Sequence, residues 1–225
     1  MKLRRFLLLT ITPMILLGST LTIQAEEPEG PTVTSPDNKY VFRKLRGDEK
    51  GTAPKSENGP VVFSVVETKS NTYVAIDAGG SLNPIQDDTA CVWSADSKHF
   101  AVNSRCGGRY EVTELFAFDG KKFNRLASFE EMIAEKLEEA RAAKLKKAKV
   151  PADTYLRRIW DTYKTLKWID STTVEVYGMS SRAFMVNKET EEMDGVEVEF
   201  IFTIKYDKKG QPHVTDQRKA PTKES

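Results

Sequence analysis

The feature that most constrains the fold of this chain is a succession of short apolar runs separated by turn residues. From Lys39 onward, runs of four to nine residues rich in Val, Phe, Tyr and Ile alternate with gaps that carry Asn, Asp, Gly, Ser and Pro. Runs of this length favour strands, and the shorter gaps favour antiparallel hairpins. We expect strands at residues 39–45, 60–67, 72–77, 91–94, 99–103, 110–118 and 121–126.

The apolar period changes at Ser128, where residues 128–149 have the spacing of an amphipathic helix. Ser128 and Glu131 form a capping-box pattern at its start, and Pro151 limits its end. A second helix is predicted from Thr154 to about Lys167, with Tyr155, Ile159, Tyr163 and Leu166 toward the core. Strands are then predicted at residues 172–179, 195–207 and 212–217. The expected fold is α+β and mainly β: an antiparallel twisted sheet or sandwich of hairpins with a helical insertion at 128–167.

The N-terminus has the three parts of a secretory signal peptide. Basic residues precede an apolar run, and a polar stretch ends at Ala25. We expect cleavage after Ala25 and export to the periplasm or the extracellular space, with a retained membrane anchor as the alternative. Ser19 stands where a bacterial lipoprotein would need a cysteine, so no lipid anchor is expected.

After residues 1–25 the chain is nearly neutral, and its composition divides it into three predicted segments. Loss of residues 1–25 removes Lys2, Arg4 and Arg5 and leaves 31 basic against 33 acidic side chains, so nucleic acid is not an expected partner. Residues 26–36 are predicted to be a flexible linker, 37–218 a single β-rich domain, and 219–225 a disordered tail.

A turn phrase recurs along the chain. "TSPDNKYVFR" at residues 34–43 aligns with "WSADSKHFAV" at 93–102, and "WIDSTTVEVY" from Trp168 is a weaker third copy. In this, the chain resembles the blade repeats of TolB-like and prolyl-oligopeptidase-type β-propellers. The resemblance implies two to three incomplete blades, too few to close a ring within one chain. An open sheet and a partial propeller completed by self-association both stay open as interpretations.

Cys91 and Cys106 are the two cysteines of the chain. An even count in an exported protein favours a disulfide between them, with two buried thiols as the alternative.

The loop "NSRCGGRYE" is the strongest candidate binding loop. Arg105 and Arg109 flank Gly107 and Gly108, which allow close backbone approach, so the loop is a candidate receptor for a carboxylate or phosphate. Solvated arginines on a glycine turn are the alternative.

Acidic residues give two further hypotheses. Asp77, Asp87 and Asp88 could hold calcium through oxygen ligands, and Asp87 with Asp88 or Asp96 could form the acidic pair of a hydrolase. Catalytic signatures such as GxSxG and HExxH do not occur in the sequence.

The expected function is therefore an exported, non-enzymatic domain that binds a protein or envelope component, with no cofactor. A hydrolase-like enzyme and an anion-binding or calcium-binding periplasmic protein are the alternatives. The basic run at 141–149 could make weak contact with an anionic membrane surface, or it could be a solvated helix end.

Overall fold

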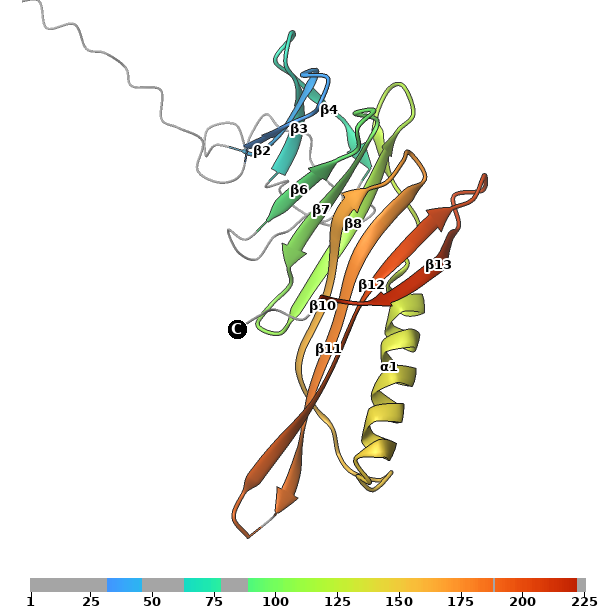
Figure 1. The fold of residues 1–225 in the computed structure, drawn as a ribbon. Coiled ribbons are helices and arrows are strands. Elements are labelled where there is room, and N and C mark those ends of the chain that lie inside the picture. Colours follow the sequence, from blue (N-terminus) through green and yellow to red (C-terminus); the bar gives the residue numbers. More distant parts are fainter. Residues whose placement is uncertain (1–31, 46–62, 78–88, 188, 222–225) are drawn as a thin grey trace, which may run out of the picture.

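The computed structural model describes residues 32–45, 63–77, 89–187 and 189–221, and within these ranges the chain is mainly β with one helix (Figure 1). The predicted α+β class with antiparallel hairpins is confirmed. One sheet has the order β1-β2-β3-β4, and a nine-stranded sheet has the order β13-β12-β11-β10-β8-β7-β6, with β9 beside β8 and β5 beside β9. The elements are β1 Thr32–Thr34, β2 Tyr40–Lys44, β3 Phe63–Glu67, β4 Thr72–Val74, β5 Ile76–Asp77, β6 Ala90–Trp93, β7 His99–Arg105, β8 Tyr110–Phe118, β9 Phe123–Arg125, α1 Glu130–Lys147, β10 Arg157–Trp168, β11 Thr173–Asn187, β12 Glu192–Tyr206 and β13 Pro212–Lys219.

Three strand groups follow one another in the chain, and we call them the first unit (β1–β4), the second unit (β6–β9) and the third unit (β10–β13). Within each unit most neighbours pair as antiparallel hairpins. The second and third units join through a short parallel pairing of β8 with β10, in which Asp161 lies opposite Tyr110 and Thr162 opposite Glu111. β1 lies within the segment predicted to be a flexible linker, where Thr32–Thr34 pair with β2; the expectation for that part of 26–36 was wrong.

Two apolar clusters hold these units together, and the second unit contributes to both. In β7, Phe100 and Val102 pack against the first unit, whereas Ala101 between them packs toward the third unit and α1. This alternation is what a strand with two covered faces requires. The first cluster is formed by Phe42, Phe63, Val65, Cys91, Phe100, Val102, Phe116 and Phe123. The second is formed by Ala101, Leu115, Phe129, Ile133, Leu137, Tyr163, Val174, Val176, Val198, Phe202, Ile204 and Tyr206.

The recurring turn phrase makes the same aspartate-to-backbone hydrogen bond at all three positions. In each copy an aspartate Oδ1 accepts the backbone N–H of the residue two positions later; the aspartates are Asp37, Asp96 and Asp170, and the N···O distances are 3.0, 3.0 and 2.7 Å. The first two copies also place Asn38 and Ser97 in the left-handed region, at φ 59° and 58°. The sequence repeat is thus a structural repeat of its turns, while the likeness to propeller blades stays a prediction.

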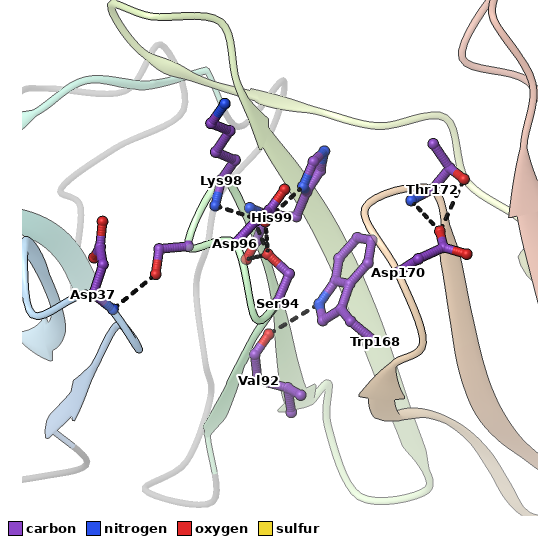
Figure 2. A network of polar contacts seen from close by, with 10 residues as sticks. Asp37, Val92, Ser94, Asp96, Lys98, His99, Trp168, Asp170 and Thr172 are labelled. Carbon is purple, nitrogen blue, oxygen red and sulfur yellow. Dashed lines mark hydrogen bonds and ion pairs between the residues drawn. The ribbon is translucent and has the colours of Figure 1, made fainter.

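Each tryptophan of the repeat ties its own unit to the preceding one. Trp93 donates its indole N–H to the carbonyl of Val33 at 3.2 Å, and Trp168 donates to the carbonyl of Val92 at 3.1 Å (Figure 2). Val33 and Val92 hold equivalent positions in the repeat. The centre of the His99 ring lies 5.2 Å from the centre of the Trp168 ring.

The helix α1 packs on one face of the third unit, and residues of the second unit pack into the same cluster on that face. Ser128 Oγ accepts the N–H of Glu130 at 3.2 Å, and Phe129 holds the cap position, so the predicted capping box of Ser128 with Glu131 was wrong although the helix itself is confirmed. The helix approaches the sheet closely at Gly178, where a Cβ atom would lie 2.8 Å from Ile133 Cγ2.

The second predicted helix was wrong, because its residues form the strand β10. Of the residues expected to face a core there, Tyr155, Ile159 and Leu166 are exposed. The segment is rich in β-branched and aromatic residues, and its long antiparallel pairing with β11 decides its conformation. The helical insertion therefore ends near Lys147 rather than at 167.

The face of the third unit that points away from α1 carries charged pairs. Glu175 bonds Lys167 at 3.2 Å and Arg218 at 2.9 Å, and the Tyr177 hydroxyl donates to Glu199 at 2.7 Å. Burial opposes ionisation of Glu175, but its hydrogen bonds with Lys167 and Arg218 outweigh burial and lower its pKa. A polar outer face of this kind ends a stack of sheets rather than extending it.

Candidate functional site

The candidate anion loop at 105–109 is used largely for internal contacts. The Arg105 guanidinium lies 4.7 Å from the centre of the Trp160 ring, and Arg109 donates to the carbonyl of Arg158 at 3.1 Å. Gly107 takes φ +77°, and nothing lies within 4 Å of a Cβ placed on Gly107 or Gly108. The loop therefore anchors the start of β10, and a receptor role for it stays a prediction.

The acidic candidates are not brought together by the described structure. Asp77 pairs with Lys122 at 2.7 Å, while Asp87 and Asp88 lie outside the described residues. Asp96 forms hydrogen bonds within its own turn. Burial alone would raise the pKa of Asp96, but the hydrogen bonds from Ser94 and from the backbone outweigh burial, so the pKa is lowered. In the described ranges no three His, Cys, Asp or Glu residues are grouped to hold a metal ion.

The predicted disulfide is not formed in the structure, where Cys91 and Cys106 are free thiols. Cys91 lies opposite Val102 in the β6–β7 pairing, so Cys106 falls beyond the end of β7 and past the reach of Cys91. Burial raises the pKa of the Cys91 thiol far above its ordinary value, which makes this thiol a poor nucleophile. The alternative of two buried thiols holds for Cys91, whereas Cys106 is partly exposed.

A cavity of about 450 Å³ lies where the C-terminal end of α1 meets the β11–β12 hairpin. Its apolar lining comes from Leu145, Ala148, Phe184 and Val196, and its polar lining from Lys144, Lys147, Asp194, Gly195 and Glu197. Lys144 Nζ donates to the carbonyl of Glu197 at 2.6 Å, which ties the helix end to β12. A cavity of this size with a mostly apolar lining and a few charges fits a group from a ligand or partner.

A polar belt formed by Asp161, Ser180 and Arg182 of the sheet and Arg141 of α1 lies under the helix. Arg182 donates two hydrogen bonds to the carboxylate of Asp161 on β10, at 2.6 and 3.1 Å, and Arg158 forms an ion pair with the same carboxylate at 3.0 Å. One turn of helix before the cavity, Arg141 donates to the hydroxyl of Ser180 at 2.9 Å. Burial lowers the pKa of Arg141, and the positive charge of Arg182 lowers it further. These contacts hold β10 and β11 together under α1, and none of the residues that make them lines the cavity.

Beyond the cavity the β11–β12 hairpin extends as a two-stranded ribbon past the end of α1 (Figure 1). Near its end, which we call the hairpin tip, Met185 and Met193 are cross-strand partners and are 45% and 47% exposed. Val186 is 56% exposed. Large apolar side chains this exposed at the end of a projecting ribbon are typical of a contact surface.

The end of α1 is basic and the hairpin tip is rich in glutamate, while the cavity between them is lined by two lysines and by Asp194 and Glu197. The end of α1 contributes Lys144, Lys146 and Lys147, and Lys149 follows it; the hairpin tip contributes Glu189, Glu191 and Glu192. Glu191 and Glu192 take part in no ion pair with any other residue in the part of the chain that the structure describes. The arrangement can attract an acidic group of a ligand to the end of α1 and a basic group to the tip.

Sequence reasoning did not single out this site. The available signal was the apolar run "AFMV" directly before "NKETEEMDG", an acidic stretch next to a further methionine. The pattern places the chain in two strands, but only the length of the ribbon and the position of α1 show that its end projects.

Comparisons with known proteins add no relative to this description: no protein-family model matches the sequence, and no curated protein matches it. Within the described ranges, no helix has the length and the apolar character to cross a membrane.

Proposed function

We propose that this chain is an exported, non-enzymatic binding module that recognises a protein partner through the cavity beside α1 and the hairpin tip. The observation that carries the proposal is the coincidence of the two features on one hairpin: Phe184 and Val196 line the cavity, and Met185, Val186 and Met193 are exposed directly beyond it. Methionine is suited to such a role because its flexible, polarisable side chain adapts to different apolar partners.

The internal contacts of the site support a rigid rather than a collapsible surface. The contact of Lys144 with the Glu197 carbonyl joins two residues of the cavity lining and ties the end of α1 to β12. A surface that is already formed does not lose the conformational entropy of ordering when it binds, which favours affinity. Export, on which the compartment of the partner depends, rests on the signal-like residues 1–25 and is part of the proposal.

The test is residue-specific photo-crosslinking in the native host. A photoreactive amino acid is placed at Met193 in one version of the chain and at Ile169 in another, since Ile169 is 52% exposed but lies at the turn between β10 and β11. We expect a protein adduct at position 193 that is at least tenfold more abundant than any adduct at position 169. Equal labelling at both positions, or none at 193, would refute the proposed contact surface.

A further inference from the structure

We infer that the partner contributes an extended peptide segment, which adds as a strand to the edge of β12 at residues 193–199 and places one apolar side chain in the cavity. The inference rests on the proposed function and names the chemistry of the partner at the same site. Three features carry it: the length of the β12 edge, the direction of the backbone groups along it, and the position of the cavity.

β12 is longer than the strand that pairs with it on the side away from β11. β12 spans Glu192–Tyr206, and β13 pairs with it only from Phe200 to Tyr206. Over residues 192–199, β11 is the one strand that pairs with β12 within the described ranges. Figure 1 shows the ribbon continuing past the last residues of β13. An edge of this kind is a template for one more strand.

Two contacts show that backbone groups at this edge point away from β11. The carbonyl of Glu197 accepts a hydrogen bond from Lys144 Nζ at 2.6 Å. The N–H of Gly195 donates to Oδ1 of its neighbour Asp194 at 2.7 Å. Because alternate residues of a strand direct both backbone groups to the same side, Met193, Gly195 and Glu197 form one row, which we call the edge row. Both of these partners are exposed side chains, so water can solvate them when a peptide main chain takes their place.

The cavity lies against the edge row, on the side of the ribbon to which a peptide side chain would project. Gly195 has no side chain and lines the cavity with backbone atoms, and Glu197 of the same row also belongs to the lining. Val196 between them lines the cavity together with Phe184 of β11. Side chains of directly opposed strand residues share one face of a sheet, so a peptide residue opposite Val196 points into the cavity. A space of about 450 Å³ has room for a large apolar side chain.

A backbone row beside an apolar cavity fits an extended peptide better than a lipid chain. The main chain of a peptide supplies donors and acceptors to the row, and one of its side chains fills the cavity. A hydrocarbon chain fills the cavity but offers nothing to the backbone groups. The charged lining residues are two lysines and two carboxylates, so their charges balance, and we expect an uncharged apolar residue at this place of the peptide; they are Lys144, Lys147, Asp194 and Glu197.

The test begins with selection from a displayed library of random linear peptides, each about a dozen residues long, against immobilised residues 26–225. The dissociation constant of a selected peptide is then measured by fluorescence anisotropy with wild type and four variants. Gly195→Pro removes a donor of the edge row, and Ala148→Trp fills the cavity from the end of α1. The matched controls are Gln217→Pro, at the outer edge of β13, and Ala143→Trp, at an exposed position of α1.

We expect wild type and both controls to bind the selected peptide equally well, and Gly195→Pro and Ala148→Trp to weaken binding at least about tenfold. Unchanged binding by Gly195→Pro would overturn the inference. So would the absence of any selected peptide with a Kd below about 100 µM for wild type.

A second readout uses wild type alone and so does not depend on the folding of any variant. Each backbone nitrogen of the selected peptide is methylated in turn, and the dissociation constant is measured again. An added strand directs every second N–H to β12, so methylation there should weaken binding about tenfold, whereas methylation of the residues between should change it less than about twofold. A scan without this alternation would overturn strand addition.

The crosslinking experiment at position 193 separates this inference from the proposed function. A preferred adduct at 193 together with an alternating scan supports both. A preferred adduct at 193 without a peptide that binds as a strand supports the binding module and overturns strand addition. Labelling without preference for position 193 refutes the proposed function and the inference with it, because no partner in the host then uses this edge.

Discussion

The substitution Asn103→Asp is predicted to weaken the contact between the second and third units in a pH-dependent way. The Asn103 side chain is 6% exposed and makes two hydrogen bonds with Thr165: Nδ2 donates to its carbonyl at 2.9 Å, and Oδ1 accepts its N–H at 2.9 Å. The substitution keeps the shape of the side chain and removes the donor. An ionised carboxylate would then face the Thr165 carbonyl oxygen in a buried place, whereas a protonated carboxyl can donate to that oxygen as the amide does.

The expected loss of stability follows from the cost of keeping the substituted carboxyl protonated. If the folded variant keeps the substituted carboxyl protonated, the cost relative to an unfolded chain with pKa about 3.9 is about 1.4 kcal/mol for each pH unit above that value, or about 4 kcal/mol at pH 7. This is an upper value, because a polar gap of about 20 Å³ beside Asn103 has room for about one water molecule, which would solvate the ionised form.

The sign is fixed by the direction of the pKa change. A folded-state pKa raised above the unfolded value means that the variant matches wild type below about pH 4 and loses stability as pH rises toward the folded pKa. Urea unfolding followed by circular dichroism at several pH values between 4 and 7 measures the difference. Asn71→Asp, at an exposed turn, is the matched control and is expected to stay within about 0.5 kcal/mol of wild type. A deficit for Asn103→Asp below 1 kcal/mol that does not change with pH would refute the reasoning.

Three further outcomes are expected. Gly178→Ala places a Cβ atom 2.8 Å from both Ile133 and Phe202 and should lower the free energy of unfolding in urea by about 1–3 kcal/mol. The control Gly108→Ala, with open space around its Cβ, should lower it much less. Equal effects would contradict the packing of α1 on the sheet. Trp168→Phe keeps an aromatic ring but removes the donor to the Val92 carbonyl and should cost about 1 kcal/mol, with no loss indicating that water replaces the bond. Alkylation of the denatured protein without reductant should add two groups by intact mass, one each at Cys91 and Cys106, and an unmodified mass would restore the disulfide.

Apart from β1, the strands of the first two units could be predicted from the sequence because their signals are local. The turn aspartates are neighbours of the backbone groups they bind, so Asp37 and Asp96 mark their turns in any context. β10 could not be predicted in this way. Tyr155, Ile159 and Tyr163 have helical spacing, and the fact that decides against a helix is pairing with β11, whose partners follow many residues later.

The candidate site was hidden for a related reason. Leu145 and Phe184 lie on separate elements, and the cavity between them exists because α1 ends before the hairpin does. The charged belt was equally out of reach, since Asp161 lay in a predicted helix and its partner Arg182 lay between the strands predicted at 172–179 and 195–207. Glu114 lies within the apolar run at 110–118; in the structure Arg125 binds its carboxylate at 2.9 Å, while burial raises its pKa.

The short parallel junction of β8 with β10 allows two folding chains to exchange their third units. The third unit with α1 is built almost wholly from contacts within residues 128–219, and its backbone link to the second unit consists of the pairings at Asp161 and Thr162. The rest of that interface is made by side chains, among them the hydrogen bonds of Asn103 and Trp168, the contacts of Arg105 and Arg109 with β10, and the packing around Ala101 and Leu115. A third unit from a neighbouring chain can satisfy every one of these contacts, because none depends on which chain supplies it. At high concentration during refolding, the junction is therefore the place where domain swapping is expected to begin.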